Sequence, residues 1–111
     1  MLTVYGIKSC DGCRKALKWL TERGHAHRFV DFREQPVPAE KVHAWVDALG
    51  NKALRNTSGG SYRALPPEKK QWSEERWKHA LASDVMLIKR PVLERDGTAL
   101  TTGFRGWEAL L

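Results

Sequence analysis

The sequence lacks the features of membrane-spanning and secreted proteins. Its 111 residues include only two cysteines, and no apolar stretch approaches the length that spans a bilayer. Residues 1–5 do not combine a basic segment with a long apolar run, as a secretory signal would. We therefore expect a cytoplasmic protein without a membrane partner. In that compartment a Cys-x-x-Cys pair indicates redox chemistry rather than a structural disulfide.

The sequence also lacks a concentrated run of positive charge. Its net charge is +6 at pH 7, but no five basic residues stand in a row and acidic residues lie among them. We interpret the basic residues as a solvated surface and expect no nucleic-acid partner. A docking patch for an acidic partner or an anionic substrate is the alternative. A content of 41% hydrophobic and 29% charged residues indicates one globular domain, which we expect to be monomeric.

Both cysteines lie where a strand is expected to meet a helix. Residues 2–5 are apolar and partly β-branched, Gly6 interrupts them, and from Asp11 the sequence favours a helix. Cys10 therefore falls at a helix N-terminus, where free backbone N–H groups and the helix dipole stabilise a thiolate. Cys13 lies one turn further along, beside Cys10. Such a pair can attack a disulfide with the first sulfur and resolve the mixed disulfide with the second.

Charged and small residues flank this pair. Three basic residues, Lys8, Arg14 and Lys15, place positive charge close to the expected thiolate. We predict that the surface around the nucleophile binds substrate through Lys8, Asp11, Gly12 and Arg14.

Two other interpretations of the cysteines remain open. Free cysteines are often buried as small hydrophobic residues without any chemistry. A zinc site would combine the cysteines with His25 and His27, but a zinc finger separates its histidines by about three to five residues on a helix. Only Ala26 separates these two, in an expected strand. We therefore expect no metal, and none of the histidines is well placed as a general base.

The first half of the chain predicts a strand-helix-strand unit followed by helices. Apolar residues recur at helical spacing up to Arg23 and Gly24, and residues 27–32 then favour a strand. The helical period returns from Pro38 and ends at Gly50. Residues 56–61 predict a loop, the prolines at 66 and 67 open a helical piece, and residues 73–82 predict a helix with Ser73 as its N-cap.

The second half returns to strands. Residues 85–88 are a continuous apolar run that predicts a buried strand. Residues 92–95 and 98–101 flank Asp96-Gly97, a strong hairpin signal. The tail from 104 to 111 predicts a short helix that covers the sheet with Trp107, Leu110 and Leu111. This order is that of an α/β, thioredoxin-like fold with a mixed four-stranded sheet and an all-helical insertion at about residues 38–83.

Motifs along nearly the whole chain give it a resemblance to the arsenate reductase/Spx (ArsC-like) family, in particular to its short YffB-like thiol reductases. The matching stretches are Tyr5-Gly6-Ile7-Lys8 and Cys10-Asp11, Arg14-Lys15-Ala16, Asp31-Phe32-Arg33, Leu54-Arg55-Asn56-Thr57, Tyr62-Arg63, Ile88-Lys89-Arg90-Pro91 and Gly103-Phe104.

The resemblance implies roles for residues far apart in the sequence. It makes Cys10 the nucleophile and places Arg90, ahead of a cis Pro91, opposite it, where the guanidinium can bind an oxyanion or a carboxylate of glutathione. Glutathione is then the expected co-substrate. Asn56, Thr57 and Pro91 join the substrate-binding set. A surface role for Arg90 beside a structural proline, and a turn-forming role for Asn56 and Thr57, are the alternatives.

The departures from the family separate three functions. Its arsenate reductases resemble one another in placing three arginines around the cysteine, whereas only Arg90 matches here. Asn56, next to Arg55, and Gly103 take the other two positions, so we expect weak recognition of arsenate. Spx regulators resemble this chain in fold and in Cys-x-x-Cys, and they bind the α-subunit of RNA polymerase. The expectation is a glutathione-dependent thiol-disulfide oxidoreductase, with a redox-sensing regulator and an arsenate reductase as alternatives.

Overall fold

The structure is a computed structural model that describes residues 1–111. The chain forms two compact units: unit 1 comprises Met1–Pro36 and Arg90–Leu111, and unit 2 comprises Val37–Lys89. Unit 1 holds both cysteines and the sheet, and unit 2 is built of helices and turns. The helical insertion therefore exists but is longer than predicted, while the single-domain organisation stays a prediction.

A mixed four-stranded sheet forms unit 1. Its strands are β1 (Leu2–Gly6), β2 (His27–Asp31), β3 (Val92–Arg95) and β4 (Thr98–Thr102), in the order β2-β1-β3-β4. Strands β1 and β2 are parallel, and β3 is antiparallel to both β1 and β4. Asp96 and Gly97 have φ angles of 50° and 84°, as the predicted two-residue hairpin turn requires.

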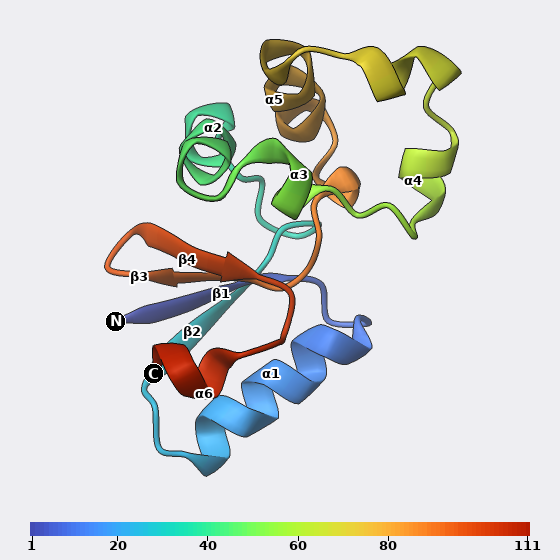
Figure 1. Ribbon diagram of the computed structural model, residues 1–111. Coiled ribbons are helices and arrows are strands. Elements are labelled where there is room, and N and C mark those ends of the chain that lie inside the picture. Colours follow the sequence, from blue (N-terminus) through green and yellow to red (C-terminus); the bar gives the residue numbers. More distant parts are fainter. The chain divides into compact units, whose positions relative to one another are not determined.

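Two helices, α1 (Asp11–Glu22) and α6 (Trp107–Leu110), lie on the same side of this sheet (Figure 1). The core between them and the sheet is wholly apolar because α1 presents one apolar stripe and each strand alternates its side chains. Its buried members are Leu2, Val4, Ala16, Leu20, Leu93 and Trp107. Trp107 also donates its indole N–H to the carbonyl of Gly103 (3.0 Å). The prediction for the tail is correct except at Leu110, which is 39% exposed.

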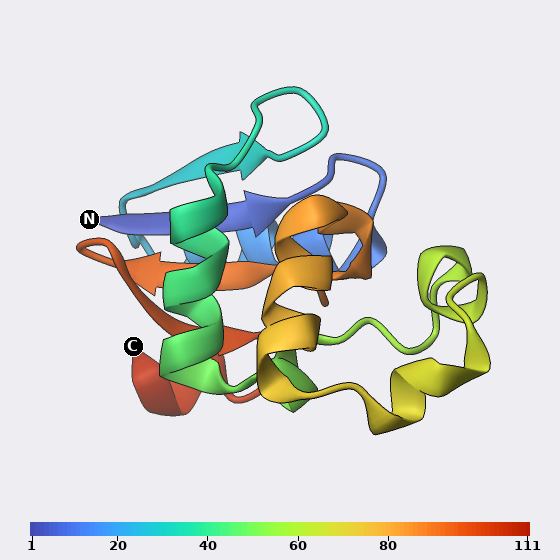
Figure 2. The ribbon, with the colours of Figure 1, turned by 90° about the horizontal axis from the view of Figure 1, so that it is seen from above.

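Unit 2 contains four α-helices and two 3₁₀ turns. The two longest helices, α2 (Ala39–Leu49) and α5 (Glu74–Ser83), lie side by side in both views (Figures 1 and 2). Ser73 caps α5 by accepting the N–H of Arg76 (3.1 Å), as predicted. The shorter elements are α3 (Asn51–Leu54), α4 (Gly60–Arg63), η1 (Pro67–Gln71) and η2 (Val85–Leu87).

The predicted strand at residues 85–88 is wrong. The structure has η2 there, because the Asp84 carboxylate accepts the N–H of Met86 (3.0 Å) and starts a tight turn. Ile88 only bridges to Arg55. An apolar run of four residues fits a buried turn as well as a buried strand, so the insertion extends to Lys89. No helix of the structure is long and apolar enough to cross a membrane.

Candidate active site

The junction between β1 and α1 fixes the backbone around Cys10. The N–H of Cys10 donates to the carbonyl of Ile7 (3.2 Å), and its own carbonyl accepts the N–H of Arg14 (3.0 Å). Cys10 is the N-cap of α1, with extended backbone angles. It is partly exposed, whereas Cys13 is 0% exposed, and both are free thiols. The predicted place of Cys10 at the helix N-terminus is therefore correct.

The surroundings of Cys10 favour its thiolate. Partial burial by itself raises the pKa of Cys10, but hydrogen bonds to the sulfur outweigh that effect and lower the pKa below the ordinary 9.0. The donors are the backbone N–H and the thiol of Cys13, the side chain of Arg90 and the backbone N–H of Gly12. The site at the helix N-terminus therefore stabilises the thiolate form of Cys10 relative to that of an ordinary cysteine.

Cys13 has the opposite environment. Burial, with the negative charge of Cys10, raises the pKa of Cys13 to about 12, although the Ile7 backbone and Arg90 act in the other direction. Its sulfur lies against the strand at Gly6, where a β-carbon would come closer to the Sγ than 3.0 Å. Cys13 is therefore a buried thiol directly beside Cys10, and its pKa of about 12 keeps it protonated at neutral pH.

Arg90 contributes more donors than Cys10 uses. Its side chain hydrogen-bonds the Cys10 sulfur, while its Nε and Nη1 are buried without a hydrogen-bond partner. Buried donors without a partner are uncommon and indicate a place for an acceptor from outside the protein. The Arg90–Pro91 peptide bond is cis, as expected. The structure brings Arg90 to Cys10, and its role toward a ligand stays a prediction.

Gly12 and Pro91 lie close to each other beside the Cys10 sulfur. A β-carbon at Gly12 would be 3.8 Å from the Cys10 Sγ, 3.9 Å from the Arg90 carbonyl oxygen and 3.9 Å from the Pro91 Cδ. Pro91 is itself fully buried, and its carbonyl accepts the N–H of Gly103 (2.7 Å). The absence of a side chain at Gly12 therefore leaves the Cys10 sulfur open on the side of the cis peptide.

Lys8 and Arg14, the two cations that the sequence predicted beside the Cys10 sulfur, have other partners. The Lys8 ammonium pairs with Glu34 (2.7 Å), and the Arg14 guanidinium pairs with Asp11. Neither cation is among the groups that lower the pKa of Cys10. The prediction that Lys8 and Arg14 hold the anionic sulfur therefore has no support in the geometry, and Arg90 is the cation that reaches it.

Asp31 fixes the loop that precedes Cys10. Its carboxylate, 4% exposed, accepts the backbone N–H of Lys8 (3.0 Å) and of Arg33 (2.9 Å). Burial raises the pKa of Asp31, but these hydrogen bonds and the charges of Arg33 and Lys8 outweigh it and lower the pKa. Sequence reasoning gave Asp31 no role at the site. An acid at the carboxyl end of the strand next to β1 was the signal that could have identified it.

Asn56 and Thr57 belong to unit 2. They lie in the turn between α3 and α4, where the N–H of Asn56 donates to the carbonyl of Leu87 (2.8 Å). Arg55 donates to the Asn51 side chain and stacks on Trp77, with its guanidinium carbon 3.9 Å from the ring centre. These contacts fix Arg55 and Asn56 within unit 2. The predicted substrate-binding role of Asn56 and Thr57 stays a prediction, and the predicted loop at 56–61 ends at Gly59 because α4 begins at Gly60.

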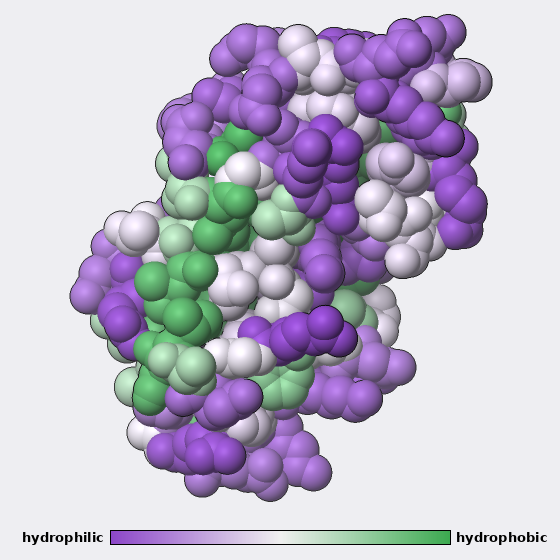
Figure 3. Space-filling view, viewed as in Figure 1, coloured by the Kyte–Doolittle hydropathy of each residue, from purple (hydrophilic) through white to green (hydrophobic).

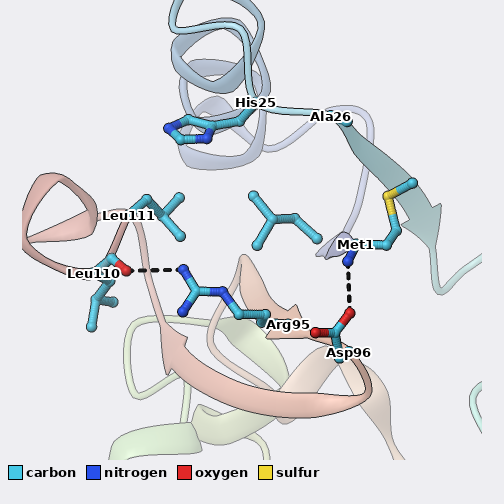
Figure 4. Close-up of a pocket in the computed structure, with 8 residues that line it drawn as sticks. Met1, His25, Ala26, Arg95, Asp96, Leu110 and Leu111 are labelled. Carbon is cyan, nitrogen blue, oxygen red and sulfur yellow. Dashed lines mark hydrogen bonds and ion pairs between the residues drawn. The ribbon is translucent and has the colours of Figure 1, made fainter.

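A cavity lies at the other end of the sheet from Cys10. It measures about 370 Å³ and is lined by both chain ends and the β3-β4 turn (Figure 4). Arg95 donates to the Leu110 carbonyl (3.0 Å), and Asp96 pairs with the Met1 ammonium (2.7 Å). Figure 3 shows hydrophobic residues gathered on one part of the surface that it draws. Among the residues that line this cavity, Met1 is 63% exposed. The cavity holds neither cysteine, and no group of three or more metal-ligating side chains exists in the chain.

Comparisons with known proteins decide the family. The sequence model of the ArsC family matches residues 5–109. This chain belongs to the ArsC family. It is 43% identical over 108 residues to the protein YusI of Bacillus subtilis (strain 168), a match that covers 94% of this chain and 91% of YusI.

Solved structures of ArsC-family relatives have the same thioredoxin-like fold. A possible arsenate reductase from Streptococcus mutans UA159 is 36% identical, with a TM-score of 0.86 over 99% of this chain and 97% of that one. The YffB protein is 31% identical, with a TM-score of 0.87 over 99% and 96%. The predicted family and α/β fold class are thereby confirmed, and membership in the ArsC family supports a thiol-based oxidoreductase.

Proposed function

We propose that this ArsC-family protein is a thiol-disulfide oxidoreductase in which Cys10 attacks the substrate, Cys13 resolves the intermediate and glutathione supplies the electrons. One observation carries the proposal. Two free thiols on one helical turn have opposite surroundings, because the environment of Cys10 lowers its pKa and that of Cys13 raises its pKa to about 12. Only the partly exposed sulfur is then a nucleophile at neutral pH.

The steps conserve atoms and electrons. The Cys10 thiolate displaces one sulfur of a substrate disulfide, which forms a mixed disulfide and releases one thiolate that takes up a proton. The Cys13 thiol then loses its proton and attacks the Cys10 sulfur, which releases the second thiol and leaves a Cys10–Cys13 disulfide. Two glutathione thiols restore both cysteines and become one glutathione disulfide.

The first step itself prepares the second. Part of the rise in the Cys13 pKa comes from the negative charge and hydrogen bonding of Cys10. Once Cys10 is joined to the substrate its sulfur carries no charge, so that part disappears and Cys13 loses its proton more readily. The resolving thiol is thus least reactive while the nucleophile is free.

Arg90 supports glutathione as the reductant. Glutathione carries carboxylates, and the Nε and Nη1 of Arg90 are two buried donors beside the reacting sulfur. Carboxylates bind such donors strongly. Arsenate would also be attracted to them, but a single arginine offers one positive charge to a doubly charged oxyanion.

Turnover of a small disulfide and of arsenate, with glutathione and with thioredoxin as alternative reductants, tests the proposal. We expect glutathione-dependent turnover of the disulfide that Cys10→Ser reduces to the uncatalysed background. Cys13→Ser is expected to leave only slow turnover through a glutathione mixed disulfide. Full activity of Cys10→Ser would contradict the proposal. Absence of turnover, together with redox-dependent retention of the RNA polymerase α-subunit, would replace it with the regulator.

A further inference from the structure

We propose that Gly6 is a positioning residue for the resolving cysteine: the missing side chain at Gly6 leaves the space in which the Cys13 sulfur lies beside Cys10. This inference rests on the proposed function, in which Cys13 closes a disulfide with Cys10. It concerns a residue of the strand that touches neither substrate nor the reacting Cys10 sulfur.

The contact is specific to one atom. A β-carbon at Gly6 would approach the Cys13 Sγ to less than 3.0 Å, a distance that real β-carbons essentially never show. Its other neighbours would be the Cys13 Cβ at 3.5 Å and the Phe29 Cε1 at 3.7 Å, which are ordinary van der Waals distances. A methyl group at this position would therefore overlap only the sulfur.

The backbones of Gly6 and Cys13 cannot easily move apart. Gly6 pairs with Asp31 in the parallel β1-β2 ladder, and its carbonyl accepts the N–H of Phe32 (3.0 Å). Cys13 is fully buried on α1, in line with the core residues Ala16 and Leu20. With both backbones fixed, a methyl group at Gly6 would displace the sulfur by rotating the Cys13 side chain, and the displaced sulfur would leave its place beside Cys10.

Backbone conformation does not require glycine here. Gly6 does not have the positive φ that favours glycine at Gly24, Gly50, Gly97, Gly103 and Gly106. It is a strand residue with ordinary angles, so alanine could adopt its backbone. Space for the Cys13 sulfur is therefore the physical reason for glycine at this position.

The test compares three alanine variants with the full-length protein. Gly6→Ala is the change of interest, and Gly60→Ala is the matched control, because nothing lies within 4 Å of a β-carbon at Gly60 and its φ is not positive. Gly6→Ala in a Cys13→Ala background removes the sulfur that the new methyl would overlap. Each reduced protein is mixed with oxidised glutathione, the products are followed by mass spectrometry, and thermal unfolding is measured.

The expected results separate positioning from general packing. Gly6→Ala should accumulate the Cys10–glutathione mixed disulfide and close the Cys10–Cys13 ring about 100-fold more slowly, since misplaced reacting groups lose rate on that scale. It should lower Tm by about 5–15 °C when Cys13 is present. In the Cys13→Ala background the same change should leave Tm unaltered, and Gly60→Ala should behave as the unchanged protein in both measurements.

Ring closure at the original rate in Gly6→Ala would overturn the inference, and so would an equal fall in Tm in the two backgrounds. If Gly6→Ala does not fold while the double variant does, the overlap with the sulfur is supported; if neither folds, the inference fails. Failure of the proposed function is distinguishable, because the unchanged protein would then form neither a mixed disulfide at Cys10 nor a Cys10–Cys13 disulfide.

Discussion

The surroundings of Cys10 and those of Cys13 differ although one helical turn carries both. Cys10 lies at the open N-terminus of α1, where backbone N–H groups and Arg90 lower its pKa. Cys13 lies against β1 without exposure, where burial raises its pKa to about 12. Because the two residues have the same chemistry, the difference comes from their surroundings, which are hydrogen-bond donors at Cys10 and deeper burial at Cys13. In the proposed mechanism these two places separate the nucleophile, at the N-terminus of α1, from the resolving thiol, against the sheet.

The largest expected effect is the selectivity of alkylation between these two sites. At pH 7 a thiol with a pKa near 12 is ionised in only about one molecule in 10⁵, and Cys13 is also inaccessible. Iodoacetamide should therefore modify Cys10 more than about 1,000-fold faster than Cys13 in the folded, reduced protein. Peptide mapping after timed quenching measures both rates. In denaturant the two rates should become similar, and comparable labelling in the folded state would contradict the contrast.

A smaller effect is expected from the removal of Arg90, whose side chain lowers the pKa of Cys10. Arg90→Met removes a charged donor from the Cys10 sulfur, which should raise the pH midpoint of Cys10 alkylation by about one unit. At a pH below both midpoints the alkylation rate should fall about tenfold. Well above both midpoints the unchanged protein and Arg90→Met should react alike, since Cys10 is then anionic in each of them.

Arg105→Met is the control for this prediction, because Arg105 is an exposed arginine of the same unit. It should leave the midpoint where it is. An unchanged midpoint in Arg90→Met would show that backbone donors alone hold the thiolate. Arg90→Lys should restore part of the shift through its charge, without the buried fork of donors.

Local signals were enough to predict the place of Cys10 and most elements of unit 1. Gly6 and Asp11 mark where β1 ends and α1 begins, and Asp96-Gly97 specifies the hairpin turn within two residues. The run at 85–88 failed because four apolar residues have no period that separates a strand from a turn. The deciding interaction there was the side chain of Asp84, one residue outside the run.

The site itself was less predictable because its partners come from distant positions. Lys8 is close to Cys10 in sequence, yet its ammonium pairs with Glu34 on the loop after β2. The contact of Gly6 with Cys13 exists only once α1 packs on β1, and the contacts of Asp31 need the parallel register. Sequence proximity therefore overestimated the nearby cations, whereas Arg90 was placed by its resemblance to a family motif rather than by any local signal.

The smallest expected effect is that of a methyl group added beside the Cys10 sulfur. Gly12→Ala would place a methyl group 3.8 Å from the Cys10 Sγ, in ordinary contact, and would keep the backbone N–H that donates to it. Stability should change by less than about 0.5 kcal/mol, and turnover of a small disulfide should be unchanged. A bulky protein disulfide must approach across this surface, so its turnover should slow about threefold, on the order of 0.6 kcal/mol. Equal slowing of both substrates would mean that the methyl group at Gly12 changes the reactivity of the Cys10 sulfur rather than the access of substrate to it. The added methyl groups at Gly12 and Gly6 would then both act on a cysteine sulfur, and their effects would differ only in size.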